Sequence, residues 1–243
     1  MKSHALAVIA LCAPLLAAHA QGDARWRSLD VSRQLRDTAA QRIKVQYGAG
    51  RVDVRGTDAA LLYDMHLRYD EQRAAPLHRY DAEQRSTLLG LEPRSVNSRV
   101  SSGTRSESGE LRLLLPRAVP LDLDLEFGGT EAMLELGGLA LQSVRLECGA
   151  TDATLGFTAP NRTHMRELNV DVGAASFTAL HLGNANADQI RVRGGIFPLH
   201  FAHDGHPEPL LQSALPLVAH RRHRLFLRAR RLEHARQGRP LRA

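Results

Sequence analysis

Leu125-Glu126-Phe127-Gly128-Gly129 is one copy of a short pattern that decides the fold class of this protein. An apolar, a polar and an apolar residue lead into glycine and a short polar turn, and alternation with a period of two is typical of a strand with one buried face. Glycine permits the turn. The other copies are Val45-Gln46-Tyr47-Gly48-Ala49, Leu146-Glu147-Cys148-Gly149-Ala150 and Val170-Asp171-Val172-Gly173-Ala174, and Val192-Arg193-Gly194-Gly195 resembles the start of a fifth.

The spacing of the pattern indicates stacked repeats. The glycines at positions 128, 149, 173 and 195 are separated by 21, 24 and 22 residues, which is enough for one rung of two or three short strands. A rung of this size cannot bury its own apolar face, so the rungs must stack. We therefore predict a mainly-β protein, a β-solenoid or open stack of hairpins over residues 21–195. The side chains expected in its core are Leu125, Phe127, Leu146, Cys148, Val170 and Val172.

The segments before the repeats also alternate. Residues 42–47, 51–55, 61–69 and 86–91 are predicted to be strands, with the pattern of antiparallel pairs. The Ser- and Arg-rich stretch over residues 93–109 is predicted to be a long flexible loop.

Composition and charge narrow the class of protein. The chain has 243 residues, of which 43% are hydrophobic and 24% charged, as in an ordinary folded protein. Its net charge of +6 comes from the end of the chain, because residues 21–195 carry 22 basic and 23 acidic side chains. A nucleic-acid-binding body is therefore not favoured.

The N-terminus predicts export. Met1 to Ala20 has a positive start at Lys2, an apolar run over residues 5–18 and small residues in Ala18-His19-Ala20, which together are typical of a signal peptide. No later segment is apolar enough for a membrane span, so a periplasmic or secreted protein is expected. Only Cys148 would remain, so no internal disulfide can form, and its strand position favours a small buried side chain over a catalytic thiol.

The chain resembles the bacterial toast-rack proteins, which are related to LiaF-like cell-envelope stress domains and to adhesin-like β-helical domains. The resemblance covers roughly residues 28–195. It rests on residues 45–52, on Leu61-Leu62-Tyr63, on Gly109-Glu110-Leu111-Arg112-Leu113 with Pro116, and on the glycine repeats. It implies an exported β-solenoid whose relatives include proteins that act by protein contact in envelope-stress signalling. It implies no catalytic residue and no cofactor.

Four carboxylates form the candidate site. Stacking would align Glu126 with Glu147 and Asp171, and Asp124 shares the strand face of Glu126. Such a column can bind a cation or a ligand, or cleave a polysaccharide by acid/base chemistry. The same alignment brings Arg145 and Arg193 nearby, which favours a solvated polar face with paired charges.

The tail, residues 196–243, differs from the body. It contains no Thr, Asn, Tyr, Lys, Met or Cys but holds six of the twelve His and five of the eleven Pro. Because the repeat breaks where another strand is due, we interpret the tail as a frameshifted ending. It is then expected to be irregular or weakly helical, with any helix between Leu210 and Gln237, and to leave the edge of the last rung open to self-association.

A genuine tail would have other functions. Its basic residues would bind nucleic acid, anionic lipid or lipopolysaccharide. These residues are Arg221, Arg222, Arg224, Arg228, Arg230 and Arg231. The histidines at positions 200, 203, 206, 220 and 223 raise metal binding as a further alternative, although prolines interrupt the first three.

The favoured function is an exported, non-enzymatic β-solenoid that makes protein or cell-envelope contacts. The alternative is a carbohydrate-active β-helical enzyme or binding protein that uses the acidic strand face.

Overall fold

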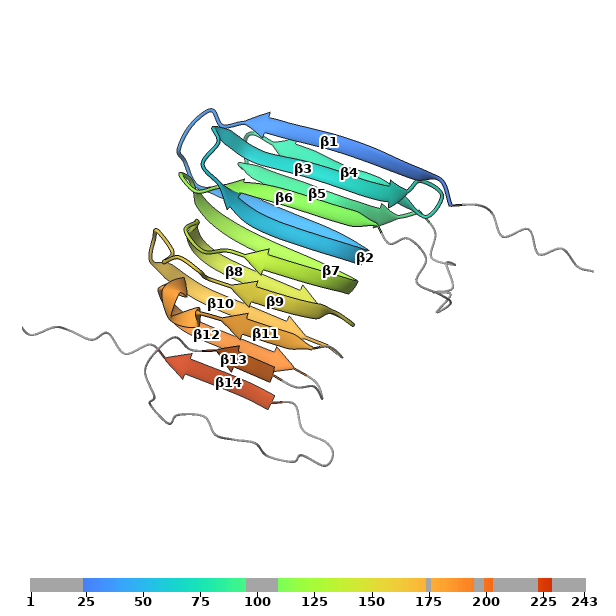
Figure 1. Ribbon diagram of the computed structural model, residues 1–243. Helices are drawn as coiled ribbons and strands as arrows, with labels where there is room; N and C mark the ends of the chain where they lie inside the picture. Colours follow the sequence, from blue (N-terminus) through green and yellow to red (C-terminus); the bar gives the residue numbers. More distant parts are fainter. Residues whose placement is uncertain (1–23, 95–108, 174–175, 195–198, 203–222, 229–243) are drawn as a thin grey trace, which may run out of the picture.

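The computed structural model describes residues 24–94, 109–173, 176–194, 199–202 and 223–228, and these form a stack of strands (Figure 1). The only helical element among the described residues is the short 3-10 turn Leu182–Ala185. The strands are β1 Trp26–Gln34, β2 Gln41–Thr57, β3 Leu61–Asp70, β4 Ala74–Asp81, β5 Ser86–Pro93, β6 Glu110–Pro116, β7 Pro120–Glu135, β8 Ala140–Cys148, β9 Asp152–Gly156, β10 Met165–Val172, β11 Phe177–Leu180, β12 Ala187–Gly194, β13 Leu199–Ala202 and β14 His223–Arg228.

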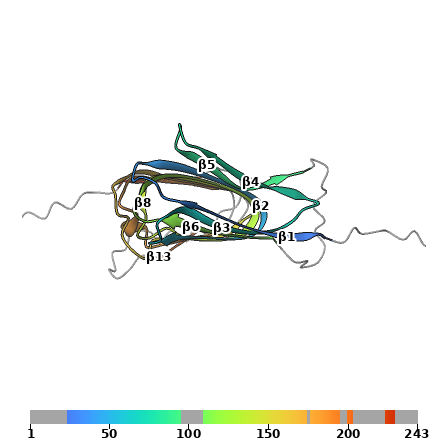
Figure 2. The same cartoon turned by 90° about the horizontal axis from the view of Figure 1, so that it is seen from above.

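The stack has two layers, and the two long strands β2 and β7 run through both of them. The first halves of β2 and β7 pair with β5 and β8, whereas their second halves pair with β6 and β9. The first sheet therefore runs β4-β5-β2-β7-β8-β10-β12-β14, and the second sheet runs β1-β3-β6-β2-β7-β9-β11-β13. Viewed along the stack, the two layers face each other across a narrow interior (Figure 2).

Each repeat predicted from the sequence is one rung with a strand in each layer. The rungs β8–β9, β10–β11 and β12–β13 follow β7, and successive strands pair in parallel. The predicted β-solenoid is confirmed for the described residues. The expectation of antiparallel pairs is wrong for β2, which pairs in parallel with β5, β6 and β7. It is correct for β3, and for β5 in its pairing with β4. Alternation specifies which face of a strand is buried but not the direction of its partner.

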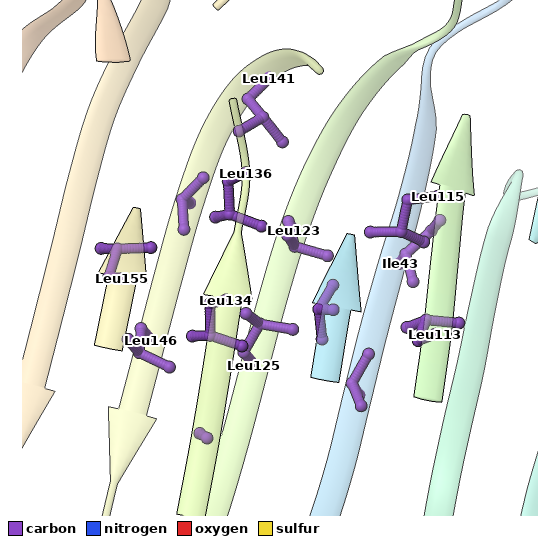
Figure 3. Close-up of a cluster of buried hydrophobic side chains, with 14 of the residues drawn as sticks. Ile43, Leu113, Leu115, Leu123, Leu125, Leu134, Leu136, Leu141, Leu146 and Leu155 are labelled. Carbon is purple, nitrogen blue, oxygen red and sulfur yellow. The ribbon is translucent and has the colours of Figure 1, made fainter. Parts of the chain in front are cut away.

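The core lies between the layers, and leucine is its commonest residue (Figure 3). In the first half of β7 the odd-numbered side chains, such as Leu123, Leu125 and Phe127, point inward and are at most 4% exposed, whereas in the second half the even-numbered Ala132 and Leu134 are the buried ones. All six side chains expected in the core are buried there. Period-two alternation therefore gave the correct inward face.

Between the two layers each rung turns at a glycine, and we call this turn, formed by Gly48, Gly128, Gly149 and Gly173, the glycine corner. Its geometry explains why glycine recurs in each repeat. A Cβ atom on Gly128 would lie 2.2 Å from the carbonyl oxygen of Gly48 in the rung before. On Gly173 it would lie 2.8 Å from the oxygen of Gly149. These glycines have no positive φ, so their role is close approach of stacked backbones rather than an unusual turn.

A buried asparagine holds the opposite corner. Asn161 is 5% exposed, accepts a hydrogen bond from the Leu141 backbone N–H, and donates to the carbonyl oxygens of Leu141 and Thr163 at 2.8–2.9 Å. Its side chain replaces ladder bonds that the turn cannot make.

The described parts of residues 196–243 are strands. β13 pairs in parallel with β11, and β14 pairs antiparallel with β12. We expected an irregular or weakly helical ending that leaves the edge of the last rung open, and this is wrong for these ten residues. The backbone N–H and C=O groups at the edges of β11 and β12 pair with an added strand instead. The rest of the tail, the predicted signal peptide and residues 95–108 of the predicted loop lie outside the described residues.

Candidate functional site

The outer face of the first sheet brings the predicted acidic residues together. Glu126, Glu147 and Asp171 are direct register partners on neighbouring strands. Gln46 and Arg193 continue this row at its two ends, and we call these five residues the acidic row. The alignment predicted for the three carboxylates is present.

Asp124 lies one row away. Its register partners are Lys44 on β2 and Arg145 on β8. Lys44 Nζ lies 3.6 Å from Asp124 Oδ2 and also forms an ion pair with Glu126, so a single cation serves two carboxylates.

Every carboxylate of the acidic row has a polar or cationic partner. Gln46 Nε2 donates to Glu126 at 2.6 Å, and Arg145 Nε donates to Glu147 at 2.7 Å. Arg193 lies 3.7 Å from Asp171. Cations next to each acid offset the repulsion between like charges stacked in a ladder.

The electrostatics of Glu126 argue against a general acid. Hydrogen bonds from Gln46 and then Lys44 lower the pKa of the Glu126 carboxyl below its usual value. The carboxyl is therefore ionised at neutral pH and has no proton to give to a leaving group. This arrangement is that of a polar face with paired charges.

A groove crosses this face, and the sequence analysis missed it. It has a volume of about 1190 Å³ and is lined by the acidic row and glycine corner on one side and by the β4–β5 hairpin on the other. The hairpin contributes Leu77, Leu88 and Leu91, and it projects away from the first sheet (Figure 2). Carboxylates and leucines therefore share one concave surface.

The signal for the groove was Gly90, inside the alternating segment of β5. Gly90 has φ +126°, and a Cβ atom there would lie 1.8 Å from the carbonyl oxygen of Gln46. A glycine inside a strand pattern indicates a bulge or a close backbone approach. The direction in which the hairpin then leaves the sheet depends on packing.

The groove contains no activated nucleophile among its described residues. Cys148 lines it but is 5% exposed, and burial raises the pKa of its thiol to about 12. A buried thiol in its neutral form is a poor nucleophile. In the described part of the chain, no three His, Cys, Asp or Glu side chains are grouped so that they could hold a metal ion.

One of the predicted tail residues lies next to the groove, because Arg224 on β14 is the register partner of Arg193 at the end of the acidic row. Arg224 and Arg228 fall on β14, whose backbone pairs with β12, and the other four arginines lie outside the described residues. No helix in the described ranges is long and apolar enough to cross a membrane.

Known proteins resemble this chain in sequence pattern and in fold. A family model described as the N-terminal domain of toast_rack, DUF2154, matches residues 21–180. A solved structure from Clostridium sporogenes ATCC 15579, titled a "putative cell adhesion protein", shares the fold with a TM-score of 0.57 at 15% identity. The match covers 70% of this chain and 76% of that one.

A second solved structure, a "putative adhesin" from Bacteroides fragilis NCTC 9343, is 9% identical over 73% of this chain and 93% of its own. Its TM-score of 0.24 is too low to indicate a shared fold. No curated protein matches the chain. The family match spans most of the glycine-corner stack, and the chain therefore belongs to the toast-rack family, through its N-terminal domain.

Proposed function

We propose that this protein is an exported, non-enzymatic contact protein whose groove binds a protein or a cell-envelope component. The observation that carries the proposal is the composition of the groove: leucines of the hairpin face carboxylates that already have their cations. Such a surface offers apolar area and directional polar groups without a poised acid, base or nucleophile.

The charges of the groove favour a polar partner that carries groups of both signs. Glu92 and the three carboxylates of the acidic row share the groove with Arg79 and Arg193, and Lys44 and Arg145 pair with two of these carboxylates. Interfaces match charges of opposite sign, which adds specificity and speeds association more than it adds affinity. The solved C. sporogenes structure, named for cell adhesion, is in keeping with a contact role but is similar in fold alone.

A pair of matched substitutions tests the groove. Leu88→Arg places a charge on the groove side of the hairpin, while Met133→Arg makes the same change on the outer face of the second sheet, where Met133 is 54% exposed. The exported chain is incubated with purified peptidoglycan, lipopolysaccharide, and proteins of the envelope fraction. Leu88→Arg is expected to lower binding at least tenfold, with Met133→Arg unchanged. Equal effects of the two variants, or none from Leu88→Arg, contradict the proposal.

The carbohydrate-active alternative is tested separately. Glu126→Gln combined with Glu147→Gln removes two charges of the acidic row without changing side-chain shape. If the unmodified protein cleaves envelope polysaccharide and this variant does not, the non-enzymatic proposal is wrong.

Export is part of the same proposal. N-terminal sequencing of the protein recovered outside the cytoplasm is expected to begin near Gln21. Recovery of chains that begin at Met1, or retention in the cytoplasm, contradicts export.

A further inference from the structure

The second sheet ends at β1, a long edge strand. β1 pairs with β3 from Trp26↔Asp70 to Arg33↔Tyr63, and no described strand pairs with its other side. Over its nine residues it contains no proline, glycine or lysine, and its register is regular until the shift between Arg33 and Gln34. An edge of this kind is a template for another strand.

The other described ends of the stack differ. β4 ends the first sheet and carries Pro76 in its middle, which has no N–H to donate. At the opposite end, β13 has four residues and β14 has six. β1 is therefore the longest edge in the described chain that lacks such a block.

The hydrogen-bond pattern shows which backbone groups face outward. The Glu71 N–H donates to the Arg25 carbonyl oxygen at 2.9 Å, so residues 25 and 71 are a hydrogen-bonded pair. Such pairs alternate along an antiparallel ladder, and the odd-numbered residues of β1 therefore bond to β3. The N–H and C=O groups of Ser28, Asp30 and Ser32 point to the free side.

We propose that a second copy of this chain pairs along β1, antiparallel, with a two-fold axis at Val31. In this register Val31 lies opposite Val31 of the second copy, Asp30 opposite Ser32, and Leu29 opposite Arg33. The two second sheets then join into one continuous sheet, and the half-buried Leu29 and Val31 gain neighbours beside the core.

Charge selects this register among its neighbours. An axis at Asp30 places two aspartates opposite each other and Arg27 opposite Arg33, which is unfavourable. An axis at Ser32 avoids like charges but pairs only residues 30–34 of β1 with one another. An axis at Leu29 pairs as many residues of β1, 26–32, but places Arg25 opposite Arg33 at the end of the ladder. The axis at Val31 pairs residues 28–34 with no like charges opposite. A self-complementary patch about a two-fold axis closes as a dimer.

Cysteine cross-linking tests both the dimer and its register. Because even-numbered residues make the new hydrogen bonds, the two Val31 residues form a non-hydrogen-bonded pair, with Cα atoms about 4.5 Å apart. That spacing is within disulfide range. The experiment uses the exported chain with Cys148→Ala, and Val31→Cys is expected to give a covalent dimer in near-complete yield under mild oxidation.

Matched controls identify the axis. Leu29→Cys would place the two thiols four residues out of register, roughly 13 Å along the strand, and is expected not to cross-link. Faster cross-linking of Asp30→Cys or Ser32→Cys than of Val31→Cys overturns the proposed register. Sedimentation equilibrium of the unsubstituted protein is expected to give twice the monomer mass, and a monomer at all concentrations overturns the dimer. Neither result depends on the proposed groove function.

Discussion

Gly128 shows at the residue scale why the glycines recur. Its hydrogen faces the Gly48 carbonyl oxygen, where any larger side chain would collide with the backbone of the rung before. A Cβ atom on Gly129, the next residue, would come no closer than 3.9 Å to the nearest such atom, the Ala150 carbonyl oxygen. Two adjacent glycines in one motif therefore have different structural roles.

This difference gives a matched pair of substitutions. Gly128→Ala is expected to destabilise the protein by about 1–3 kcal/mol, since the added methyl forces the stacked backbones apart. Gly129→Ala is expected to change stability by less than about 0.5 kcal/mol, as for most exposed positions. Urea unfolding of both variants measures the difference, and similar midpoints would contradict the close-approach explanation.

Cys148 provides a second test at this scale. Burial raises the pKa of its thiol from 9.0 to about 12, so the folded protein is expected to resist thiol reagents at pH 8 and to react fully in urea. The stabilising contribution of the neutral thiol is complete below pH 9 and is lost as the pH rises toward 12. Thr154→Cys with Cys148→Ala places a thiol on the outer face as a reactive control. Rapid labelling of native Cys148 would show that the corner opens.

At the scale of the elements, ladders of side chains connect neighbouring strands. The pKa of Glu126 is lowered by Gln46 on β2 first and then by Lys44, so the pairing of β2 with β7 includes an electrostatic contribution across the sheet. A carboxyl whose folded pKa is lowered stabilises the protein above its unfolded pKa.

Stability is therefore expected to fall on acidification. The contribution of Glu126 is present above its ordinary pKa of 4.5 and is lost as the pH falls through the lower folded value. Glu126→Gln should flatten this part of the stability curve, measured by urea unfolding between pH 3 and pH 6. Glu131→Gln, at an exposed ion pair on the second sheet, is the control. If both variants keep the full acid dependence, the ladder is not its source.

The corner between β9 and β10 depends on one amide. Asn161→Ala leaves the Leu141 N–H without its partner in a buried turn, while the Leu141 carbonyl oxygen keeps only the Thr163 hydroxyl, and a loss of about 1–3 kcal/mol is expected. Asn169→Ala, on the outer face of β10, is expected to cost less than about 1 kcal/mol. Thermal unfolding of both variants provides the comparison, and an unaffected Asn161→Ala would show that water replaces the amide.

At the scale of the whole molecule, the body of the stack is separable from the tail. Every buried hydrophobic side chain that the structure describes precedes residue 193. A chain ending at Gly195 is therefore expected to fold, with lower solubility because the edges of β11 and β12 lose the strands that cover them.

The frameshift interpretation of the tail remains a proposal with its own test. The nucleotide sequence after the Gly195 codon, read in the other frames, is expected to encode further alternating segments that end in glycine. If no frame does so, or if the chain ending at Gly195 does not fold by circular dichroism, the tail is an evolved part of the protein.

The sequence by itself determined the inward face of every repeat, the length of a rung and the row of carboxylates. These are local consequences of the period-two geometry of a strand and of the spacing of glycines. For example, the alternation of apolar and polar residues around Leu146 and Glu147 predicts that Leu146 is the buried one, and it is.

Only the tertiary structure decided the directions and the contacts. β2 pairs in parallel with segments that come 44 and 80 residues later, and a pattern within one strand carries no information about such a partner. The groove depends on how the β4–β5 hairpin leaves the sheet at Gly90, and the open edge depends on β1 lying outside β3. Both are fixed by the packing of whole elements, because the energy that selects them is shared among residues far apart in the sequence.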